Sequence, residues 1–489
     1  MSSLTLPPAA VPNQPGQPPD EEAVAAGRRR TELTLLGFAV GVVIFAFINV
    51  GLSLSGQNPG TLIEYIVIFA IIMGIGHLAV RRWAPYADPL LLPLAALLNG
   101  LGIVMIYRLH EVGRGGNASA GSPISTLAAD AVTMQIVYTV IGIACLVAFL
   151  VFVKEPRILQ RYTYLLGLIG LILFALPAFL PASISEVPGT GAKIQIAIPG
   201  LGSLQPEEFA KLCLAASFAG YLVLKRDVLK LAGRRTLGID LPRGRDMGPI
   251  LVTWAASLLL LIFESDVGTS AVFMGLFVAM IYIATSRTSW LLIGFGMFVV
   301  GALAAAELIS HVGQRFSIWL DPFSNYNLNV TGLSYQPVQG LYGMASGGVL
   351  GRGLGGGLPF WTPLVQSDMI FTAFGEELGL TGVMALLLIY GLIVQRGLRT
   401  AIMIKDPFSK LLAGGLSFML ALQVFVIVGG VTRLIPLTGI TTPWLSQGGS
   451  SLIASWVMIG ILIRLSDTAR RPAPKPIQDE GLTQVVSLK

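Results

Sequence analysis

Charged residues are scarce in this sequence. Only 12% of its 489 residues are Asp, Glu, Lys or Arg, and 54% are hydrophobic, whereas roughly a quarter of the residues of a soluble domain are charged. So little charge excludes an ordinary soluble globular protein. Cysteine is scarce too: Cys145 and Cys213 both fall in apolar runs, where two thiols indicate small buried side chains and no disulfide framework.

In place of charge, the sequence has apolar runs of about 20 residues, each long enough to cross roughly 30 Å of hydrocarbon as a helix. We predict an all-α polytopic membrane protein with about twelve transmembrane helices. Only a polar turn divides the seventh run from the eighth. The predicted spans are residues 34–53, 62–80, 89–107, 131–153, 162–182, 208–224, 249–264, 268–286, 290–310, 369–395, 410–430 and 450–465.

The two ends of the chain differ from this apolar body. Residues 1–33 are rich in Pro, Ala and acids and have no apolar face to bury, which predicts a disordered tail. The first apolar run follows Arg28, Arg29 and Arg30 directly and has full span length, which indicates an uncleaved membrane anchor rather than a cleavable signal peptide. Residues 467–489 form a second predicted tail.

The positions of the basic residues predict the orientation. With cytoplasmic N- and C-termini, 25 of the 32 Lys and Arg residues fall in cytoplasmic segments, which is the positive-inside bias. This bias explains the basic loop 225–248 without nucleic acid, so we predict no nucleic-acid partner and expect anionic membrane lipid at that loop. The opposite, outer face holds Arg108, Arg114, Lys193, Arg315, Arg352 and Arg433.

The outer segment 311–368 is far longer than an ordinary connection, and loops of that length are usually functional or disordered. Its many aromatic and aliphatic residues favour a packed segment, and its glycine-dense middle allows the backbone to approach a ligand or the membrane closely. Asp321, which precedes Pro322, is either a turn or capping aspartate or a general base at the outer membrane surface. The residues around it leave both interpretations open.

Ionisable residues near or within the predicted spans need partners there. Glu208 and Lys211 are three residues apart on one helical face and are expected to neutralise each other. Glu376 and Glu377 stand side by side in a span, where intramembrane acids mark either an internal ion pair or a polar cavity. Because adjacent helix positions diverge by about 100°, we expect the two carboxylates to face different partners. His77 is expected to hydrogen-bond to another helix.

Six stretches, taken together and in this order, resemble the SEDS family (shape, elongation, division and sporulation), whose members include RodA and FtsW. They are LQPEEFAKL, ESDVGTS, RFSIWLDPF, SGGVLGRGLGGG, SDMIFTAFGEELGLTG and PLTGITTPWLSQGGSS. The resemblance covers about residues 89–466 and implies a core of ten spans, which leaves residues 34–88 as an additional N-terminal helix pair. A pair of extra helices preserves the orientation of the core.

The resemblance implies a peptidoglycan glycosyltransferase of the bacterial cytoplasmic membrane. Such an enzyme polymerises lipid II at the outer face, with a class B penicillin-binding protein as its transpeptidase partner. Asp321 matches the family's essential acid, and a base opposite the leaving group gives inversion. Glu208 and Lys211 match the family's QPxEFAK stretch. Glu376 and Glu377 match its EELG stretch, where one is expected to support the wall of the substrate cavity and the other to cap or pair within the bundle.

The leaving pyrophosphate requires positive charge. The candidates are Lys193, Lys211, Arg352, Arg433 and a divalent cation, Mg²⁺ or Mn²⁺, and no metal-ligand cluster can be read from the sequence. The chain departs from the resemblance at residues 193–195, which read Lys-Ile-Gln where many members have Arg-Arg-Trp. This departure bears on the substrate contacts of that stretch.

Two other functions fit twelve spans with intramembrane acids: a flippase or transporter of lipid-linked precursors, and a non-catalytic scaffold for cell-wall enzymes. Transporters often have two related halves, whereas this sequence has no evident internal repeat and its polar motifs gather on one face. The extra N-terminal pair and the short C-terminal tail favour a RodA-like role in elongation and cell shape over a role in cell division.

Overall fold

The structure is a computed structural model. It describes residues 21–53, 59–114, 124–185, 195–198, 202–229, 232–236, 239–242 and 267–472, with a few isolated residues between 248 and 255.

Helices dominate the described part of the chain, as the apolar runs predict. Nine of the described helices are long and apolar enough to cross a membrane, which confirms an all-α polytopic membrane architecture. They are α1 (Glu21–Ser53), α2 (Pro59–Trp83), α3 (Leu91–Arg114), α4 (Ile124–Phe152), α10 (Val267–Thr285), α11 (Thr288–Leu308), α14 (Ile370–Met403), α15 (Pro407–Val431) and α16 (Gly449–Arg470).

Two further helices occupy predicted spans. The helix α6 (Thr163–Phe179) is apolar but has only 17 residues, and α8 (Glu207–Leu229) carries charged residues at both ends. The predicted span 249–264 lies mostly outside the described residues. The predicted count of twelve therefore stays a prediction.

The remaining elements are short. They are α5 (Ile158–Arg161), α7 (Ala182–Ser185), α12 (Ser310–Leu320), the π-helix η2 (Tyr326–Val330), α13 (Tyr335–Gly347), the 3-10 helix η3 (Pro359–Trp361) and the strands β1 (Ile196–Ile198), β2 (Gly202–Leu204), β3 (Ala232–Thr236) and β4 (Ile239–Pro242). The strands form two antiparallel pairs, β1 with β2 and β3 with β4. Four of these helices, α12, η2, α13 and η3, lie in the outer segment 311–368, so that segment is ordered, as its aromatic content predicted.

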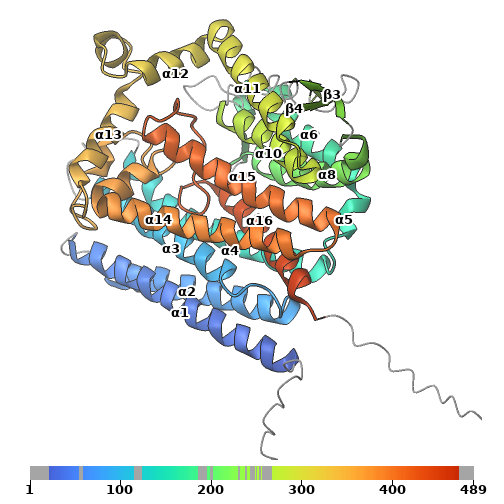
Figure 1. Ribbon diagram of the computed structural model, residues 1–489. Coiled ribbons are helices and arrows are strands. Elements are labelled where there is room, and N and C mark those ends of the chain that lie inside the picture. The colour runs from blue at the N-terminus through green and yellow to red at the C-terminus, as the bar shows by residue number, and fades with distance from the viewer. Residues whose placement is uncertain are drawn as a thin grey trace, which may run out of the picture.

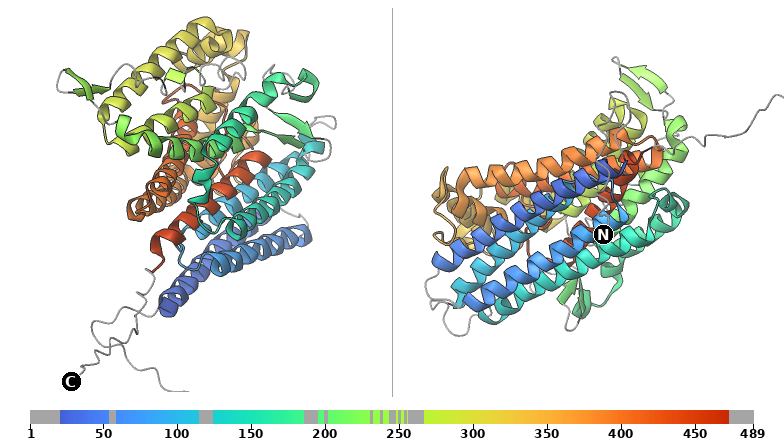
Figure 2. Two further views of the ribbon diagram at one scale, coloured as in Figure 1. Left: turned by 90° about the vertical axis from the view of Figure 1, so that its right-hand side faces the viewer. Right: turned by 90° about the horizontal axis from the view of Figure 1, so that it is seen from below.

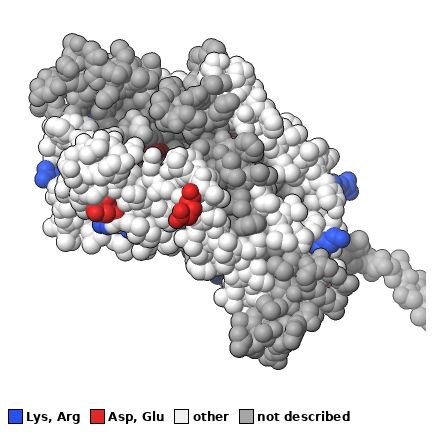
Figure 3. Space-filling view, turned by 90° about the horizontal axis from the view of Figure 1, so that it is seen from above, with Lys and Arg blue, Asp and Glu red and all other residues white. Residues whose placement is uncertain are grey.

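The long helices lie side by side in one bundle (Figures 1 and 2). The most buried span is α16, which packs against α4 and also contacts α3, α8, α14 and α15. Helices α1 and α2 lie along one edge of the bundle, against α3 and α4, and α11 lies beyond α10 at the opposite edge. Phe295, Val300 and Leu308 of α11 point outward and are more than half exposed, as side chains that contact lipid are. Charged side chains are few on the described surface seen from above (Figure 3).

The described chain starts and finishes at the same end of the bundle. Arg28, near the start of α1, donates to the carbonyl oxygen of Tyr86, and the Tyr86 N–H donates to Asp467 near the end of α16 over 2.9 Å. The elements α12 and α13 lie at the other end (Figure 1). A chain that crosses the membrane an even number of times is expected to start and finish at the same end of the bundle.

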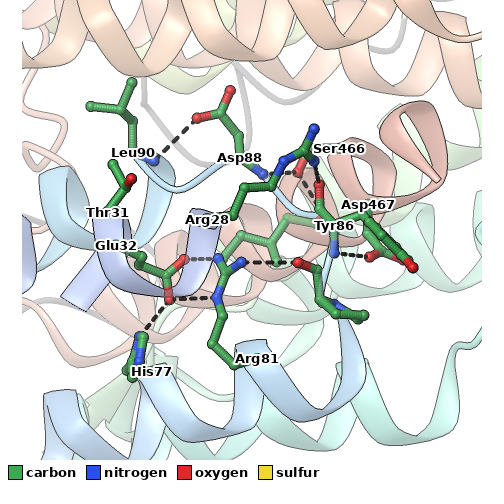
Figure 4. Close-up of polar contacts among 12 residues, drawn as sticks. Arg28, Thr31, Glu32, His77, Arg81, Tyr86, Asp88, Leu90, Ser466 and Asp467 are labelled. Atoms are coloured by element: carbon green, nitrogen blue, oxygen red, sulfur yellow. Dashed lines mark hydrogen bonds and ion pairs between the residues drawn. The ribbon is translucent and has the colours of Figure 1, made fainter. Parts of the chain in front are cut away.

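A buried ionic network ties α1 and α2 together at this shared end (Figure 4). Glu32, which is 0% exposed, accepts from Arg81 Nε over 3.1 Å and also contacts Arg81 Nη2. His77 Nδ1 lies 2.8 Å from the same carboxylate, which confirms the expected helix-to-helix hydrogen bond. On the core side, Asp88 binds Arg470 of α16 over 2.7 Å. The network therefore joins the N-terminal helix pair to the rest of the molecule.

This network also corrects the predicted N-terminal tail of residues 1–33. Helix α1 begins at Glu21, so the helical part of the chain starts thirteen residues before the first predicted span. The apolar pattern alone placed the start at residue 34, because Arg28 and Glu32 look like solvated residues in the sequence. Their partners on α2 and beyond it make them part of the folded bundle.

Candidate active site

Asp321 directly follows α12 and is its C-terminal cap residue, which confirms the capping interpretation, and its role as a general base stays a prediction. Its backbone N–H donates to the Ser317 carbonyl over 3.0 Å, and its own carbonyl accepts from Asn327 Nδ2 over 2.7 Å. Pro322 explains why the helix stops here, because a residue before proline avoids the helical conformation. The side chain of Asp321 is exposed, and no ion pair of its carboxylate occurs within the described ranges. The capping role belongs to the backbone, and the carboxylate is available for chemistry.

Two arginines fasten α12 to the segment between α15 and α16. Arg433 donates from Nε to the Trp319 carbonyl over 2.9 Å and from Nη2 to the Leu320 carbonyl over 2.6 Å. The Trp319 indole N–H returns a hydrogen bond to the Arg433 carbonyl over 3.2 Å. In the opposite direction, Arg315 of α12 donates to the carbonyls of residues 437 and 438 over 3.0 and 2.7 Å. We call this pair of reciprocal contacts the arginine brace.

A pocket of about 560 Å³ opens beside the brace. Arg315, Trp319 and Pro322 line it on the α12 side, Arg433 lines it from the opposite segment, and Asp368 contributes a carboxylate. Asp321 precedes Pro322 in the sequence but does not itself line the pocket, and we call this position the rim of the pocket. Cations, an aromatic ring and apolar residues in one cavity suit a ligand with both anionic and apolar parts.

Glu376 and Glu377 lie on α14 and both hold the glycine-rich segment that follows α13. Glu376 accepts from the Leu358 N–H over 2.7 Å, and Glu377 accepts from the Gly355 N–H over 2.9 Å. The two carboxylates face different partners, as their helix positions predict, but both partners belong to one segment that folds back over α14. A Cβ atom added to Gly357 would lie 3.0 Å from Glu377 and 3.2 Å from Glu376.

Arg108 of α3 completes this second cluster. Its Nε lies 3.1 Å from Glu377, and its Nη2 donates to the carbonyls of Gly355 and Gly357 over 2.8 and 3.0 Å. Both charged side chains are buried, at 3% and 0% exposure. Neither glutamate lines the 560 Å³ pocket. The contacts show instead that the two carboxylates hold the glycine-rich segment in place. Glu377 pairs within the bundle, as expected of one of the two, and the cavity-wall role expected of the other stays a prediction.

The glycine-rich segment also pairs with the α14 backbone. Leu380 donates to the Gly348 carbonyl over 2.9 Å, and Gly353 donates to the Glu377 carbonyl over 2.8 Å. Helix α14 is interrupted at Gly379, which has φ of 67°, a left-handed value that favours glycine. Arg352 lies in the same segment with an exposed side chain, outside the pocket lining.

Glu208 and Lys211 form the local ion pair that their spacing predicts. Lys211 Nζ lies 2.9 Å from Glu208 Oε1, and both side chains are buried. Helix α8, which carries them, packs with α6, α10, α15 and α16, whereas Asp321 ends α12. Lys193 lies outside the described residues, so its predicted role is not placed.

The roles of three residues in these clusters were not predicted from the sequence. Arg108 and Arg315 were noted only as outward basic residues, and Trp319 only as one of many aromatics. An arginine at the end of an apolar run, as Arg108 is, was a usable signal, since such a charge needs a buried partner. The partner itself is 269 residues away in sequence, which no local pattern reveals.

A divalent cation has no ligand set in the described part of the chain, where no group of three or more His, Cys, Asp or Glu residues is close enough to hold a metal ion. Two carboxylates lie at the pocket: Asp368 in its lining and Asp321 at its rim. We therefore derive no chemical step from a metal.

Comparisons with known proteins agree with this geometry. The family model FTSW_RODA_SPOVE, described as a cell cycle protein, matches residues 89–471, which is the range the resemblance predicted within a few residues. The peptidoglycan glycosyltransferase RodA of Mycobacterium tuberculosis (strain ATCC 25618 / H37Rv) is 46% identical over 449 residues, which cover 91% of this chain and 92% of that protein.

Solved structures show the same fold. One, described as "Structural coordination of polymerization and crosslinking by a peptidoglycan synthase complex", matches with a TM-score of 0.59 at 25% identity and covers 79% of this chain and 99% of its own. The crystal structure of the Thermus thermophilus rod shape determining protein RodA matches with a TM-score of 0.51 at 23% identity, covering 79% of this chain and 98% of its own.

Proposed function

The chain belongs to the FtsW/RodA/SpoVE family of cell cycle proteins, and from that membership we propose that it is a peptidoglycan glycosyltransferase that polymerises lipid II. The observation that carries the proposal is the exposed side chain of Asp321, next in sequence to Pro322, which lines a pocket together with Arg315 and Arg433. A glycosyl transfer from a lipid pyrophosphate needs this combination of a base and positive charge.

The reaction has a simple balance of bonds. The 4-hydroxyl oxygen of the acceptor sugar forms a bond to the anomeric carbon of the donor, and the bond from that carbon to the pyrophosphate oxygen breaks. Asp321 takes the hydroxyl proton, and the lipid leaves as its pyrophosphate. Attack opposite the leaving group inverts the anomeric carbon and makes a β-linkage from an α-linked donor.

Of the predicted cations, Arg433 lines the pocket and contributes positive charge there, although its Nε and Nη2 are already bound to the carbonyls of Trp319 and Leu320. Arg315 joins it there. Lys211 is engaged by Glu208, and Arg352 lies on the glycine-rich segment. Apolar residues of the same pocket suit the first part of the lipid tail, which explains why this chemistry belongs in a helical bundle.

The outer face of the membrane is the proposed place of the reaction. Helix α12, which lines the pocket, lies at the end of the bundle opposite to the start of α1 and the end of α16 (Figure 1), and the positive-inside bias favours a cytoplasmic location for that shared end. A crosslinking partner, a class B penicillin-binding protein, is supported by the likeness to a peptidoglycan synthase complex. The similarity to proteins named RodA, at 46% identity against 30% for one named FtsW, favours elongation over division.

Purified protein incubated with lipid II tests the proposal. Wild type should produce glycan strands, and Asp321→Asn should reduce the rate by at least about 100-fold, the usual contribution of a general base. Glu307→Gln, which removes another exposed acid fourteen residues earlier and outside the pocket lining, is the matched control and should retain activity.

Two results would contradict the proposal. Production of glycan strands by Asp321→Asn at the wild-type rate would show that Asp321 is not the base. No strands from a well-folded wild type, with or without a crosslinking partner, would leave transport of the precursor or a scaffolding role instead.

A further inference from the structure

The hydrogen bonds of Asp321 are made by its own backbone N–H and carbonyl. Its carboxylate has no ion pair within the described ranges, and α12 ends at the preceding residue. A carboxylate at the C-terminus of a helix faces the negative end of the helix dipole and the last unpaired carbonyls. Something must neutralise these carbonyls if the carboxylate is to stay fixed beside them.

Arg433 is placed to do this. Its Nε and Nη2 donate to the carbonyls of Trp319 and Leu320, the last two residues of α12, over 2.9 and 2.6 Å. A cation that hydrogen-bonds the final carbonyls is a favourable C-terminal cap. These contacts use two of the three guanidinium nitrogens of Arg433, the residue that the sequence suggested as a partner of the pyrophosphate.

The backbone of Arg433 supports the same reading. Its φ is 62°, in the left-handed region that residues other than glycine rarely adopt. Unusual backbone conformations persist where the surrounding structure holds them, and here the Trp319 indole N–H binds the Arg433 carbonyl over 3.2 Å. Arg315 completes the arginine brace from the α12 side.

We propose that Arg433 is a positioning residue, which caps α12 and so fixes the carboxylate of Asp321 at the pocket rim. The proposal rests on the proposed function, since the base it positions is the base of that reaction. It differs from a role in binding substrate because Arg433 makes its contacts with α12 without any substrate.

Two variants of Arg433 test the proposal. Arg433→Gly removes the guanidinium and fits the left-handed backbone, so the chain should fold. Arg433→Lys keeps the charge but has a single nitrogen and cannot bind both carbonyls. We expect the kcat for lipid II polymerisation to fall by about 100-fold in Arg433→Gly, the size of effect that follows a misplaced catalytic group, with the KM within about twofold of wild type. Arg433→Lys should lose most of the same kcat. Leu434→Ala, an exposed neighbour outside the pocket lining, is the control.

Hydrogen–deuterium exchange without substrate supplies a second readout. Amides of residues 317–327 should exchange faster in both Arg433 variants than in wild type and in Leu434→Ala. A residue that only bound pyrophosphate would leave this exchange unchanged.

The proposal is overturned by unchanged exchange in the variants, by wild-type kcat in Arg433→Lys, or by a loss carried by KM alone. If Arg433→Gly does not fold, Arg433→Lys decides between these outcomes. Should wild type make no glycan at all, the proposed function fails, and the exchange experiment still decides whether Arg433 fixes the end of α12.

Discussion

At the scale of single residues, the adjacent pair Glu376 and Glu377 shows how burial gives two like side chains different tasks. Glu377 neutralises the buried Arg108, whereas Glu376 accepts from the backbone of Leu358. An unpaired buried charge is much more costly than a changed hydrogen bond. The two residues should therefore respond differently to the same substitution.

We expect Glu377→Gln to destabilise the protein by roughly 3–5 kcal/mol, because it leaves Arg108 without its counter-charge. Glu376→Gln should cost about 1 kcal/mol or less, since the amide oxygen can still accept from the Leu358 N–H. Thermal unfolding of the purified variants measures the difference. Equal losses from the two substitutions would show that the pairing with Arg108 does not decide the stability of this cluster.

Prediction at this scale succeeded where the partner is local. The Glu208–Lys211 pair follows from a spacing of three on one helical face, and Pro322 marks the end of α12. For Glu376 and Glu377 the expectation of different partners is confirmed, but helix geometry says nothing about which segment supplies those partners. Prediction missed the arginine brace, whose paired residues are 113 to 123 positions apart and meet only through the packing of the bundle.

At the scale of elements, the N-terminal helix pair is bound to the core at both of its ends. At one end Arg28 of α1 donates to the Tyr86 carbonyl, and the Tyr86 N–H donates to Asp467 of α16, beside the ionic network of Glu32 and Arg81. At the other, Ser53, the last residue of α1, packs so closely on Gly355 that a Cβ atom there would lie 1.7 Å from its hydroxyl oxygen. Helix α1 thus reaches from the ionic network to the glycine-rich segment held by Glu377.

Glu32→Gln and Arg81→Gln should each destabilise the protein, by roughly 3–5 kcal/mol, because each leaves a buried charge unpaired. The double variant should lose less than the sum of the two, as contacting residues do. Thermal unfolding measures this coupling. Glu64→Gln, an exposed acid on α2, is the control and should change stability by about 0.5 kcal/mol or less. Additive losses in the double variant would contradict a direct pairing of Glu32 with Arg81.

The extent of most elements could be predicted because hydrophobic length is a local property. The start of α1 could not, since Arg28 and Glu32 read as a polar tail until their partners are known. The interruption of α14 was also missed: nothing near Gly379 in sequence announces that residues 347–358 will lie against it and replace its helical hydrogen bonds.

At the scale of the whole molecule, the chain is a bundle with an ionic end and a pocket end. Their assignment to the two sides of the membrane follows from the distribution of Lys and Arg. The described chain starts and finishes at one end, and α12 lies at the other, so the structure separates the two ends, and the side of the membrane that each faces stays a prediction.

Cysteine labelling in cells tests this assignment. In a chain with Cys145 and Cys213 replaced by Ala, we expect Phe323→Cys, exposed beside the pocket, to react with a membrane-impermeant maleimide in intact cells. Lys410→Cys, exposed near the start of α15, should react only after the cells are permeabilised. The reverse pattern would place the pocket in the cytoplasm, where the proposed polymerisation of an exported precursor cannot occur.

The arginine brace has one more consequence. A helix fastened at a single point can still spin about its own axis, but α12 is held at Arg315 and again at residues 319 and 320, more than a full turn later. These two points of attachment fix the rotation of α12 about its own axis. The place of Asp321 at the end of α12 is therefore set by these two anchors. Under the proposed function, a compound that displaced either arginine would inhibit the protein by turning this helix, without touching the Asp321 carboxylate.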